Sequence, residues 1–168
     1  EKNSTVTIHI YDTETGKTTL VNTGNETDQY IPRIKWTQDP NALSLVRLNR
    51  LQNKLELLIA NAKTGETKTV YTEESPTYVD MHEGNGDYVY FLANGNFILL
   101  SEKDGFSHIY LFDPKGKLVK QLTKGNWDVA SIETVDEKTK TIYFVSSEEG
   151  PLYKALYSVT LDGKKKKI

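Results

Sequence analysis

Apolar and polar residues alternate along much of the chain, and the clearest example lies in its second half. Two apolar runs, residues 97–100 and 109–112, are joined by the polar sequence Glu-Lys-Asp-Gly at residues 102–105. A second polar sequence, Asp-Pro-Lys-Gly at residues 113–116, leads into a third short run at residues 118–122. Alternation interrupted by Asp and Gly predicts three antiparallel strands joined by tight turns.

The turn glycines recur at a regular spacing. They are Gly16, Gly65, Gly116 and Gly163, and the intervals between them are 49, 51 and 47 residues. Each follows an apolar run and precedes a short segment with strand character. A period of about 40 to 50 residues built from four short strands is typical of β-propeller blades. Helical solenoids have similar periods, so the strand assignment needs separate support.

One segment also fits a helix. Six apolar residues between positions 48 and 62 share one helical face, and the segment is rich in good helix formers. However, polar residues stand at position 50 and at 52–54, where a turn is due, and the equivalent segments of the next two repeats resemble strands. We therefore interpret the segment as a hairpin.

The expected strands form one pair followed by three sets of four, which makes fourteen. The prediction is an all-β chain, a partial β-propeller of about three and a half four-stranded antiparallel blades. Residues 1–24 hold two strands of a truncated blade, and residues 25–74, 75–125 and 126–168 are one blade each, the last strand lying at the chain end.

Composition excludes several classes of protein. The chain has 168 residues, a net charge of −2 and no cysteine, and its basic and acidic residues are interspersed. We therefore expect no nucleic-acid-binding face, no disulfide and no thiolate metal site. No apolar run approaches the roughly 18 residues that cross a bilayer. The chain starts on a strand without a signal-peptide pattern, so we expect a piece of a longer protein.

The sequence offers no catalytic constellation. Residues 105–109 nearly match the G-x-S-x-G nucleophile motif but lack its final glycine. Ser107 and His108 are neighbours on a predicted strand, so their side chains point to opposite faces. His9, His82 and His108 are too scattered for a metal site, and we expect His9 and His108 to face solvent or a neighbouring blade.

Other conspicuous residues have structural interpretations. The pairs Glu73-Glu74 and Glu148-Glu149 lie in predicted loops and are expected to be solvated, although paired glutamates can bind an amine. The sequence at residues 12–14 is a turn rather than a calcium loop. Trp36 and Trp127 are expected to pack between blades. We predict no metal and no cofactor.

Residues 101–129, SEKDGFSHIYLFDPKGKLVKQLTKGNWDV, closely resemble a segment of the dipeptidyl peptidase IV family. That segment reads S-[DE]-[RK]-D-G-[FY]-x-H-[IL]-Y-[LF], then G, then [LI]-T-x-G-x-W-[DE]-V. The resemblance continues through residues 46–74 and 142–164. The family comprises serine exopeptidases of the prolyl oligopeptidase clan, with an eight-bladed N-terminal propeller and a C-terminal α/β-hydrolase domain that supplies Ser, Asp and His.

The resemblance implies a non-catalytic propeller fragment of an enzyme that removes N-terminal Xaa-Pro or Xaa-Ala dipeptides. The propeller would gate access to the active site and help to position the substrate. Because the triad domain is absent, the chain alone should hydrolyse nothing. The alternative is a standalone propeller-type protein-binding module without a hydrolase domain.

The resemblance also implies a candidate site. In the family, the loop before this blade gives an aromatic and a basic residue to the rim of the substrate pocket. Here the loop reads YVDMHE at residues 78–83, without a Phe-Arg pair, so the rim residues would be Tyr78, Asp80, His82 and Glu83. The family's glutamates that grip the substrate's amino terminus lie on an earlier blade, and their role is not transferred to the glutamate pairs here.

The implied partners are the C-terminal α/β-hydrolase domain of the same parent chain and a peptide substrate. We expect no nucleic acid and no membrane span. The end blades of a fragment expose apolar faces, so we expect self-association. By resemblance to bacterial members without cysteines, the compartment would be periplasmic or otherwise extracytoplasmic.

Overall fold

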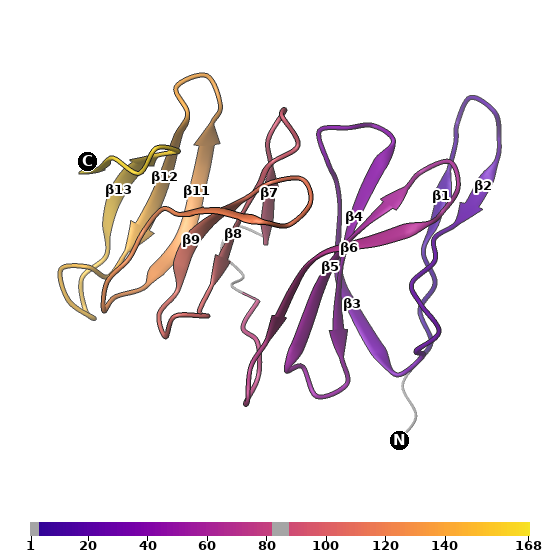
Figure 1. Cartoon of the computed structure of the whole chain (residues 1–168), viewed down its shortest axis with the longest axis horizontal. Helices are drawn as coiled ribbons and strands as arrows, with labels where there is room; N and C mark the ends of the chain where they lie inside the picture. The colour runs from indigo at the N-terminus through magenta and orange to yellow at the C-terminus, as the bar shows by residue number, and fades with distance from the viewer. Residues whose placement is uncertain (1–3, 82–87) are drawn as a thin grey trace. The chain divides into compact units, whose positions relative to one another are not determined.

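The computed structural model describes residues 4–81 and 88–168. These residues form fourteen strands in four antiparallel sheets, with no helix among them (Figure 1). The strand number agrees with the sequence prediction. The chain forms two compact units, Glu1–Val79 and Asp80–Ile168, which are described separately.

The first unit holds one two-stranded and one four-stranded sheet. In each sheet, strands that follow one another in sequence are hydrogen-bonded neighbours, which is the simplest meander. The strands are β1 (His9–Tyr11) and β2 (Thr18–Leu20), then β3 (Gln29–Trp36), β4 (Ala42–Asn49), β5 (Lys54–Asn61) and β6 (Thr67–Glu74).

The second unit holds two four-stranded meanders. The first consists of β7 (Val89–Phe91), β8 (Phe97–Ser101), β9 (His108–Phe112) and β10 (Leu118–Gln121). The second consists of β11 (Val129–Asp136), β12 (Thr141–Ser146), β13 (Ala155–Thr160) and β14 (Lys165–Lys167). Each four-stranded sheet of the chain lies inside one of the ranges expected for a blade.

The segment that also fitted a helix is a hairpin. Leu48 of β4 pairs with Leu55 of β5, and the turn between the strands occupies residues 50–53. Leu57 and Leu58 are adjacent and therefore point to opposite faces of the sheet, yet both are buried. A strand buried on both faces loses its polar alternation, which explains why periodicity alone left the segment ambiguous.

The core of the first unit lies between its two sheets. Its members come from both sheets and are Ile8, Ile10, Val21, Leu43, Leu45, Leu58 and Ala60. Val6 continues the apolar alternation of Ile8 and Ile10 toward the N-terminus, but it lies before β1, which begins at His9, and it is exposed.

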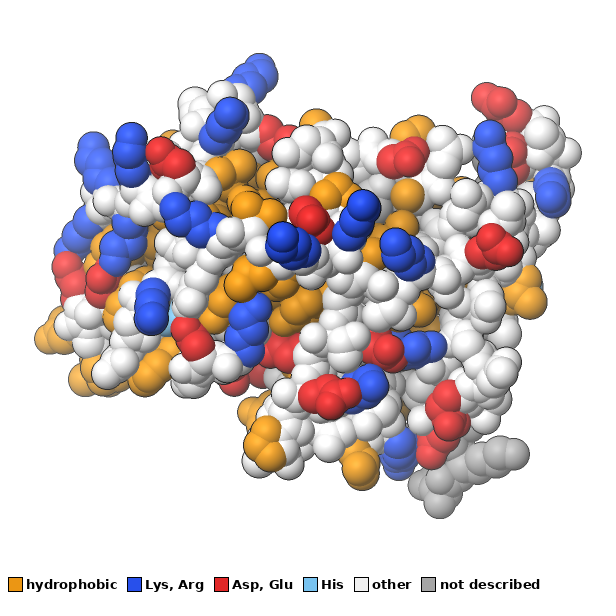
Figure 2. Space-filling model, in the orientation of Figure 1, with side chains coloured by type: hydrophobic (Ala, Val, Ile, Leu, Met, Phe, Trp, Pro, Cys, Tyr) orange, Lys and Arg blue, Asp and Glu red, His pale blue; other side chains and the backbone are white. Residues whose placement is uncertain are grey.

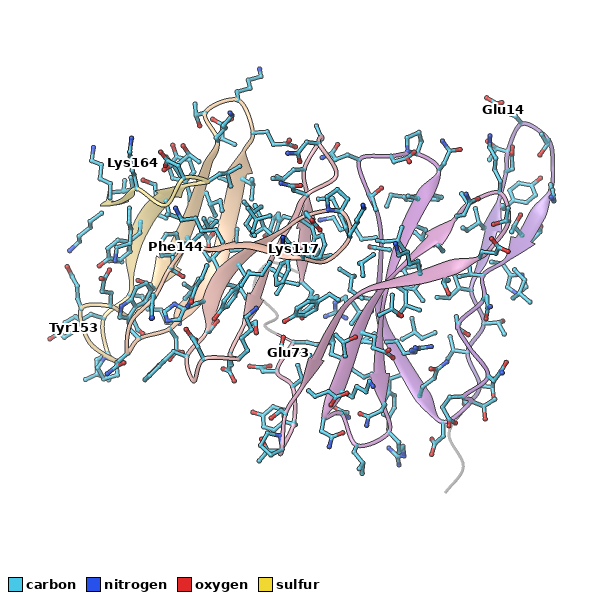
Figure 3. All side chains as sticks on the ribbon, in the orientation of Figure 1. Glu14, Glu73, Lys117, Phe144, Tyr153 and Lys164 are labelled. Carbon is cyan, nitrogen blue, oxygen red and sulfur yellow. The ribbon has the colours of Figure 1, made fainter. Side chains whose placement is uncertain are left out.

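The core of the second unit also lies between two sheets. Ile98, Ile109 and Leu111 of the β7–β10 sheet belong to the same buried cluster as Ile142 and Phe144 of β12. Figure 3 shows Phe144 among side chains within this unit. The alternation predicted for these strands therefore supplies the face that joins the two sheets.

The four repeating glycines all occupy the turn between the last two strands of a sheet. Each has a positive φ, at 70° for Gly16, 76° for Gly65, 84° for Gly116 and 92° for Gly163. In the first of these turns, Oδ1 of Asp12 accepts hydrogen bonds from the backbone N–H groups of Glu14 and Thr15. These bonds, that of Thr15 above all, hold the pKa of Asp12 below its usual value. The turn explains the repeat, because glycine enters the left-handed region at little cost.

Gly65 has a second constraint that Gly16 lacks. A Cβ added to Gly65 would lie 1.9 Å from the carbonyl oxygen of Leu20 in the neighbouring sheet. A Cβ on Gly16 would meet nothing closer than 3.9 Å. Gly65 also accepts a backbone hydrogen bond from Asn22 at 2.8 Å. This glycine therefore sets how closely the two sheets of the first unit approach.

We predict that Gly65→Ala destabilises the protein far more than Gly16→Ala. Both substitutions place alanine at a similar positive φ, which costs about 1 kcal/mol. Only Gly65→Ala also forces a clash with backbone, which raises the total to about 3 kcal/mol. Urea denaturation of the two variants measures the difference, and equal losses of stability would show that the contact with Leu20 is unimportant.

The two-stranded sheet leaves part of its neighbour uncovered. Ile34 and Trp36 of β3 pair with Leu45 and Leu43, so their side chains lie on the face that carries the core. Yet Ile34 is 56% exposed and Trp36 is 49% exposed. The expectation that Trp36 packs between blades is therefore not met in this chain.

We predict that the isolated chain self-associates through this apolar face at tens of micromolar. The double variant Ile34→Asp, Trp36→Asp should shift light scattering toward the monomer, whereas Val119→Asp on β10 should not. A wild-type chain that stays monomeric would contradict the prediction.

Candidate functional site

The candidate rim loop lies at one particular end of the β3–β6 sheet. In a four-stranded meander, the middle turn and the exit from the last strand lie at the same end, because successive strands reverse direction. We name this end the connection end; it comprises the middle turn at residues 50–53 and the segment at residues 75–79 that follows β6. Tyr78 belongs to the segment at residues 75–79, and Asp80 is the first residue after this segment.

Two backbone hydrogen bonds hold this loop to the turn. The N–H of Ser75 donates to the carbonyl of Asn53 at 2.9 Å, and the N–H of Val79 donates to the carbonyl of Gln52 at 2.8 Å. The Val79 side chain is buried, whereas Tyr78 is 63% exposed and Asp80 is exposed. Val79, which is hydrogen-bonded to the turn, therefore has an exposed residue on each side of it in the sequence.

The structure describes only two of the four predicted rim residues. Tyr78 and Asp80 lie at the surface, where a ligand can reach them. His82 and Glu83 lie outside the described residues. The role of all four residues stays a prediction.

Sequence reasoning missed a cation at the connection end. The guanidinium of Arg50 lies 5.6 Å from the centre of the Tyr30 ring, and its Nη1 donates to the Tyr30 hydroxyl. Its Nε lies 3.7 Å from Oδ1 of Asp28. Because these partners come from the start of β3 and the residue before it, no local pattern around Arg50 could have indicated the cluster.

The first glutamate pair contacts other side chains of its own sheet. Oε2 of Glu73 accepts a hydrogen bond from the Tyr71 hydroxyl at 2.7 Å. Oε1 of Glu74 lies 2.9 Å from Nζ of Lys54, and the hydrogen bond to Glu74 raises the pKa of Lys54. The expectation of simply solvated carboxylates is therefore incomplete.

The second glutamate pair braces the loop between β12 and β13. Glu148 accepts hydrogen bonds from Nζ of Lys165 at 2.5 and 2.6 Å, and Glu149 forms an ion pair with Lys167. The hydrogen bond to Glu149 raises the pKa of Lys167. β14 is the edge strand of its sheet, and these ion pairs give two of its lysines local partners; Figure 2 shows basic and acidic side chains together on the surface.

The same loop presents an exposed aromatic residue. Tyr153 is exposed at its outer tip, as Figure 3 shows. In β13, which follows this loop, burial raises the pKa of the Tyr157 hydroxyl, and the charges of Glu149 and Glu148 raise it further.

The buried side chain of His108 joins β9 to the segment at residues 123–127. It is fully buried, with Nδ1 3.1 Å from Oγ1 of Thr123 and Nε2 2.9 Å from the carbonyl oxygen of Gly125. A carbonyl only accepts, so Nε2 carries a proton. The Trp127 ring meets the imidazole edge to face at 4.9 Å. Of the two environments expected for His108, solvent and a neighbouring blade, solvent is excluded, because residues fifteen or more positions away bury the side chain.

Ser107 joins the two sheets of the second unit rather than offering a nucleophile. Its N–H donates to Oδ1 of Asp128 at 2.8 Å, and its carbonyl accepts from the N–H of Val129 at 2.8 Å. Its side chain is 1% exposed, which leaves a peptide no access to the hydroxyl.

Asp104 is the titratable group of the neighbouring turn. Burial raises the pKa of Asp104, but the hydrogen bond from Nε2 of Gln121 and further contacts outweigh this and leave the pKa below its usual value. The carboxylate therefore serves as an acceptor that ties the turn to β10.

Within residues 4–81 and 88–168, no three His, Cys, Asp or Glu side chains lie together as metal ligands. In the same ranges, no helix has the length and apolar character needed to cross a bilayer.

Four-stranded meanders that repeat with a glycine turn between their last two strands define the chain as part of a β-propeller. A sequence profile described as "Dipeptidyl peptidase IV (DPP IV) N-terminal region" matches residues 1–168. The chain belongs to this family and corresponds to its N-terminal region.

Individual relatives agree with the family match. The crystal structure of Porphyromonas gingivalis dipeptidyl peptidase 4 superposes with a TM-score of 0.89 and 38% identity, over 99% of this chain and 23% of that one. The inactive dipeptidyl peptidase 10 of Rattus norvegicus is 34% identical over 81% of this chain and 18% of its own length. Dipeptidyl peptidase 4 of Trichophyton rubrum is 28% identical over 97% and 22%. The chain thus spans about a fifth of its relatives, and the partial-propeller prediction is confirmed.

We predict that His108→Ala lowers the free energy of unfolding by about 3 kcal/mol, because it leaves a cavity beside Trp127 and removes two buried hydrogen bonds. The matched control is His9→Ala, at an exposed position on β1, which should change stability by less than about 0.5 kcal/mol. Urea denaturation followed by tryptophan fluorescence measures both. A His108→Ala variant as stable as the control would show that the contacts of His108 do not stabilise the protein.

Proposed function

We propose that this chain is the non-catalytic propeller portion of a serine exopeptidase that removes Xaa-Pro or Xaa-Ala dipeptides from peptide amino termini. Its role is to restrict access to the active site and to help position the substrate. The main support is the match of all 168 residues to the N-terminal region of the family. The superposition on Porphyromonas gingivalis dipeptidyl peptidase 4 also supports it.

The proposed site is the rim of the substrate pocket, made by Tyr78, Asp80, His82 and Glu83. The exposure of Tyr78 and Asp80 on a loop tied down at Val79 supports this role for the first two. The Tyr78 ring offers a flat apolar surface to a peptide side chain. Asp80 has a carboxylate, which favours a cationic group on the substrate.

The proposal also covers the blades of the chain, its partners and its compartment. Its blades are residues 25–74, 75–125 and 126–168, preceded by part of a blade at residues 1–24. Its partners are the α/β-hydrolase domain of the parent chain and the peptide. The proposed compartment is extracytoplasmic, in the periplasm.

We predict that the full-length parent protein hydrolyses a Gly-Pro chromogenic substrate and that the 168-residue chain alone does not. In the parent, Tyr78→Ala should raise KM about fivefold with little change in kcat, because Tyr78 contacts only bound substrate. The control is Tyr11→Ala on β1, a tyrosine that is also 63% exposed and should have no effect. Hydrolysis by the fragment, or equal KM values for both variants, would contradict the proposal.

The second candidate is a protein-binding module without hydrolytic activity. One observation favours keeping it: a relative that is 34% identical to this chain is named an inactive dipeptidyl peptidase. The parent gene distinguishes the two, because only the enzyme needs a G-x-S-x-G nucleophile motif downstream.

A further inference from the structure

We propose that the β4–β5 turn acts as a strut that fixes the loop at residues 75–79, and that Asn49 is a positioning residue for substrate binding. Asn49 touches no substrate in this scheme and acts through the turn. The predicted effect of Asn49 on substrate binding rests on the proposed function. The inference that the turn fixes the loop rests on the contacts of the first unit alone.

The first step is the direction of two carbonyl groups. The carbonyls of Gln52 and Asn53 are consecutive, and both accept hydrogen bonds from the loop, from Val79 and Ser75 respectively. In an extended strand, consecutive carbonyls point to opposite sides. The turn must therefore leave the extended conformation for both carbonyls to hold one loop.

The second step is the backbone of Gln52. Its φ is 55°, and among the described residues only one other non-glycine residue, Lys140, has a positive φ. The left-handed region costs a residue with a Cβ about 1 to 2 kcal/mol. Contacts around the turn must offset this cost, and residues held in this way cluster at functional sites.

The third step is the side chain that supplies those contacts. Oδ1 of Asn49 accepts from the N–H groups of Asn53 at 3.0 Å and Lys54 at 3.1 Å. Its Nδ2 donates to Oδ1 of Asn53 at 2.7 Å, and its carbonyl accepts from the N–H of Gln52 at 3.0 Å. One residue thus makes four hydrogen bonds that close the turn.

The equivalent turn in the next sheet has a different residue at its left-handed position. There the last residue of the second strand is Ser101, and its Oγ accepts from the N–H of Lys103 at 3.2 Å. The left-handed position in that turn belongs to Gly105, which has φ 101° and open space where a Cβ would lie. Because the left-handed residue of that turn is a glycine, the turn does not carry the cost that the contacts of Asn49 offset at Gln52.

The strut makes the rim loop rigid at its two ends. Ser75 is held where the loop leaves β6, and Val79 is held beside Tyr78. A side chain that meets a peptide from a fixed backbone loses less entropy on binding than one on a free loop. Loss of the strut should therefore weaken substrate binding without altering the chemical step.

The test uses the full-length parent protein with three variants. Asn49→Ala removes the side-chain hydrogen bonds, Asn49→Asp keeps the Oδ1 acceptor for both N–H groups, and Ser101→Ala is the control in the equivalent turn. Asn49→Ala should raise KM for a Gly-Pro substrate about fivefold with kcat unchanged, and should speed hydrogen exchange at the backbone amides of Ser75 and Val79 within the loop at residues 75–79. Asn49→Asp should restore most of both properties, and Ser101→Ala should change neither.

A further variant covers the case in which Asn49→Ala does not fold. Gln52→Val puts a β-branched residue at the left-handed position, which that residue strongly disfavours, and should reproduce both effects. Unchanged exchange at residues 75–79, or faster exchange with unchanged KM, overturns the inference. A wild-type parent that cleaves no dipeptide refutes the proposed function instead, and the exchange measurement then still decides whether the strut exists.

Discussion

The structure depends on sheets that bury apolar side chains on both faces. Leu57 and Leu58 are neighbours in β5 and point to opposite faces, and both are almost completely buried. Such a sheet cannot be stable alone, because each face must be covered by another sheet. Where the cover is incomplete, as over Ile34 and Trp36, large apolar side chains remain in contact with solvent. Stacking is therefore a requirement of the sequence, and the glycine that lets two backbones touch at Gly65 and Leu20 permits it.

Sequence reasoning could predict what depends on local pattern. The strand number, the hairpin at residues 48–62 and the four glycine turns follow from alternation and from the cost of a positive φ. It could not predict what depends on distant partners. The burial of His108 is set by Thr123 and Gly125, which a strand pattern around the histidine does not contain.

The candidate site shows the same division. The sequence placed Tyr78 and Asp80 in a loop by resemblance, and the structure adds why that loop has a defined shape. The N–H of Val79 donates to the carbonyl of Gln52, across twenty-six residues of hairpin and strand. The four hydrogen bonds of Asn49 have no signal in the apolar pattern, because asparagine in a turn is ordinary. Asn49 stands out only because the turn that its hydrogen bonds close also accepts hydrogen bonds from the loop at residues 75–79.

Several polar side chains of the first unit are engaged in hydrogen bonds that hold its strands and loops together. In the first unit, Nε and Nη2 of Arg47 donate to Glu56 while Nη1 donates to the carbonyl of Thr23. The Ser44 hydroxyl likewise donates to the carbonyl of Lys35. A side chain that satisfies a buried partner cannot also move protons for a substrate without leaving that partner unpaired. Groups at the connection ends escape this constraint because water can replace their partners. Polar side chains engaged in this way therefore contribute to the rigidity of the sheets.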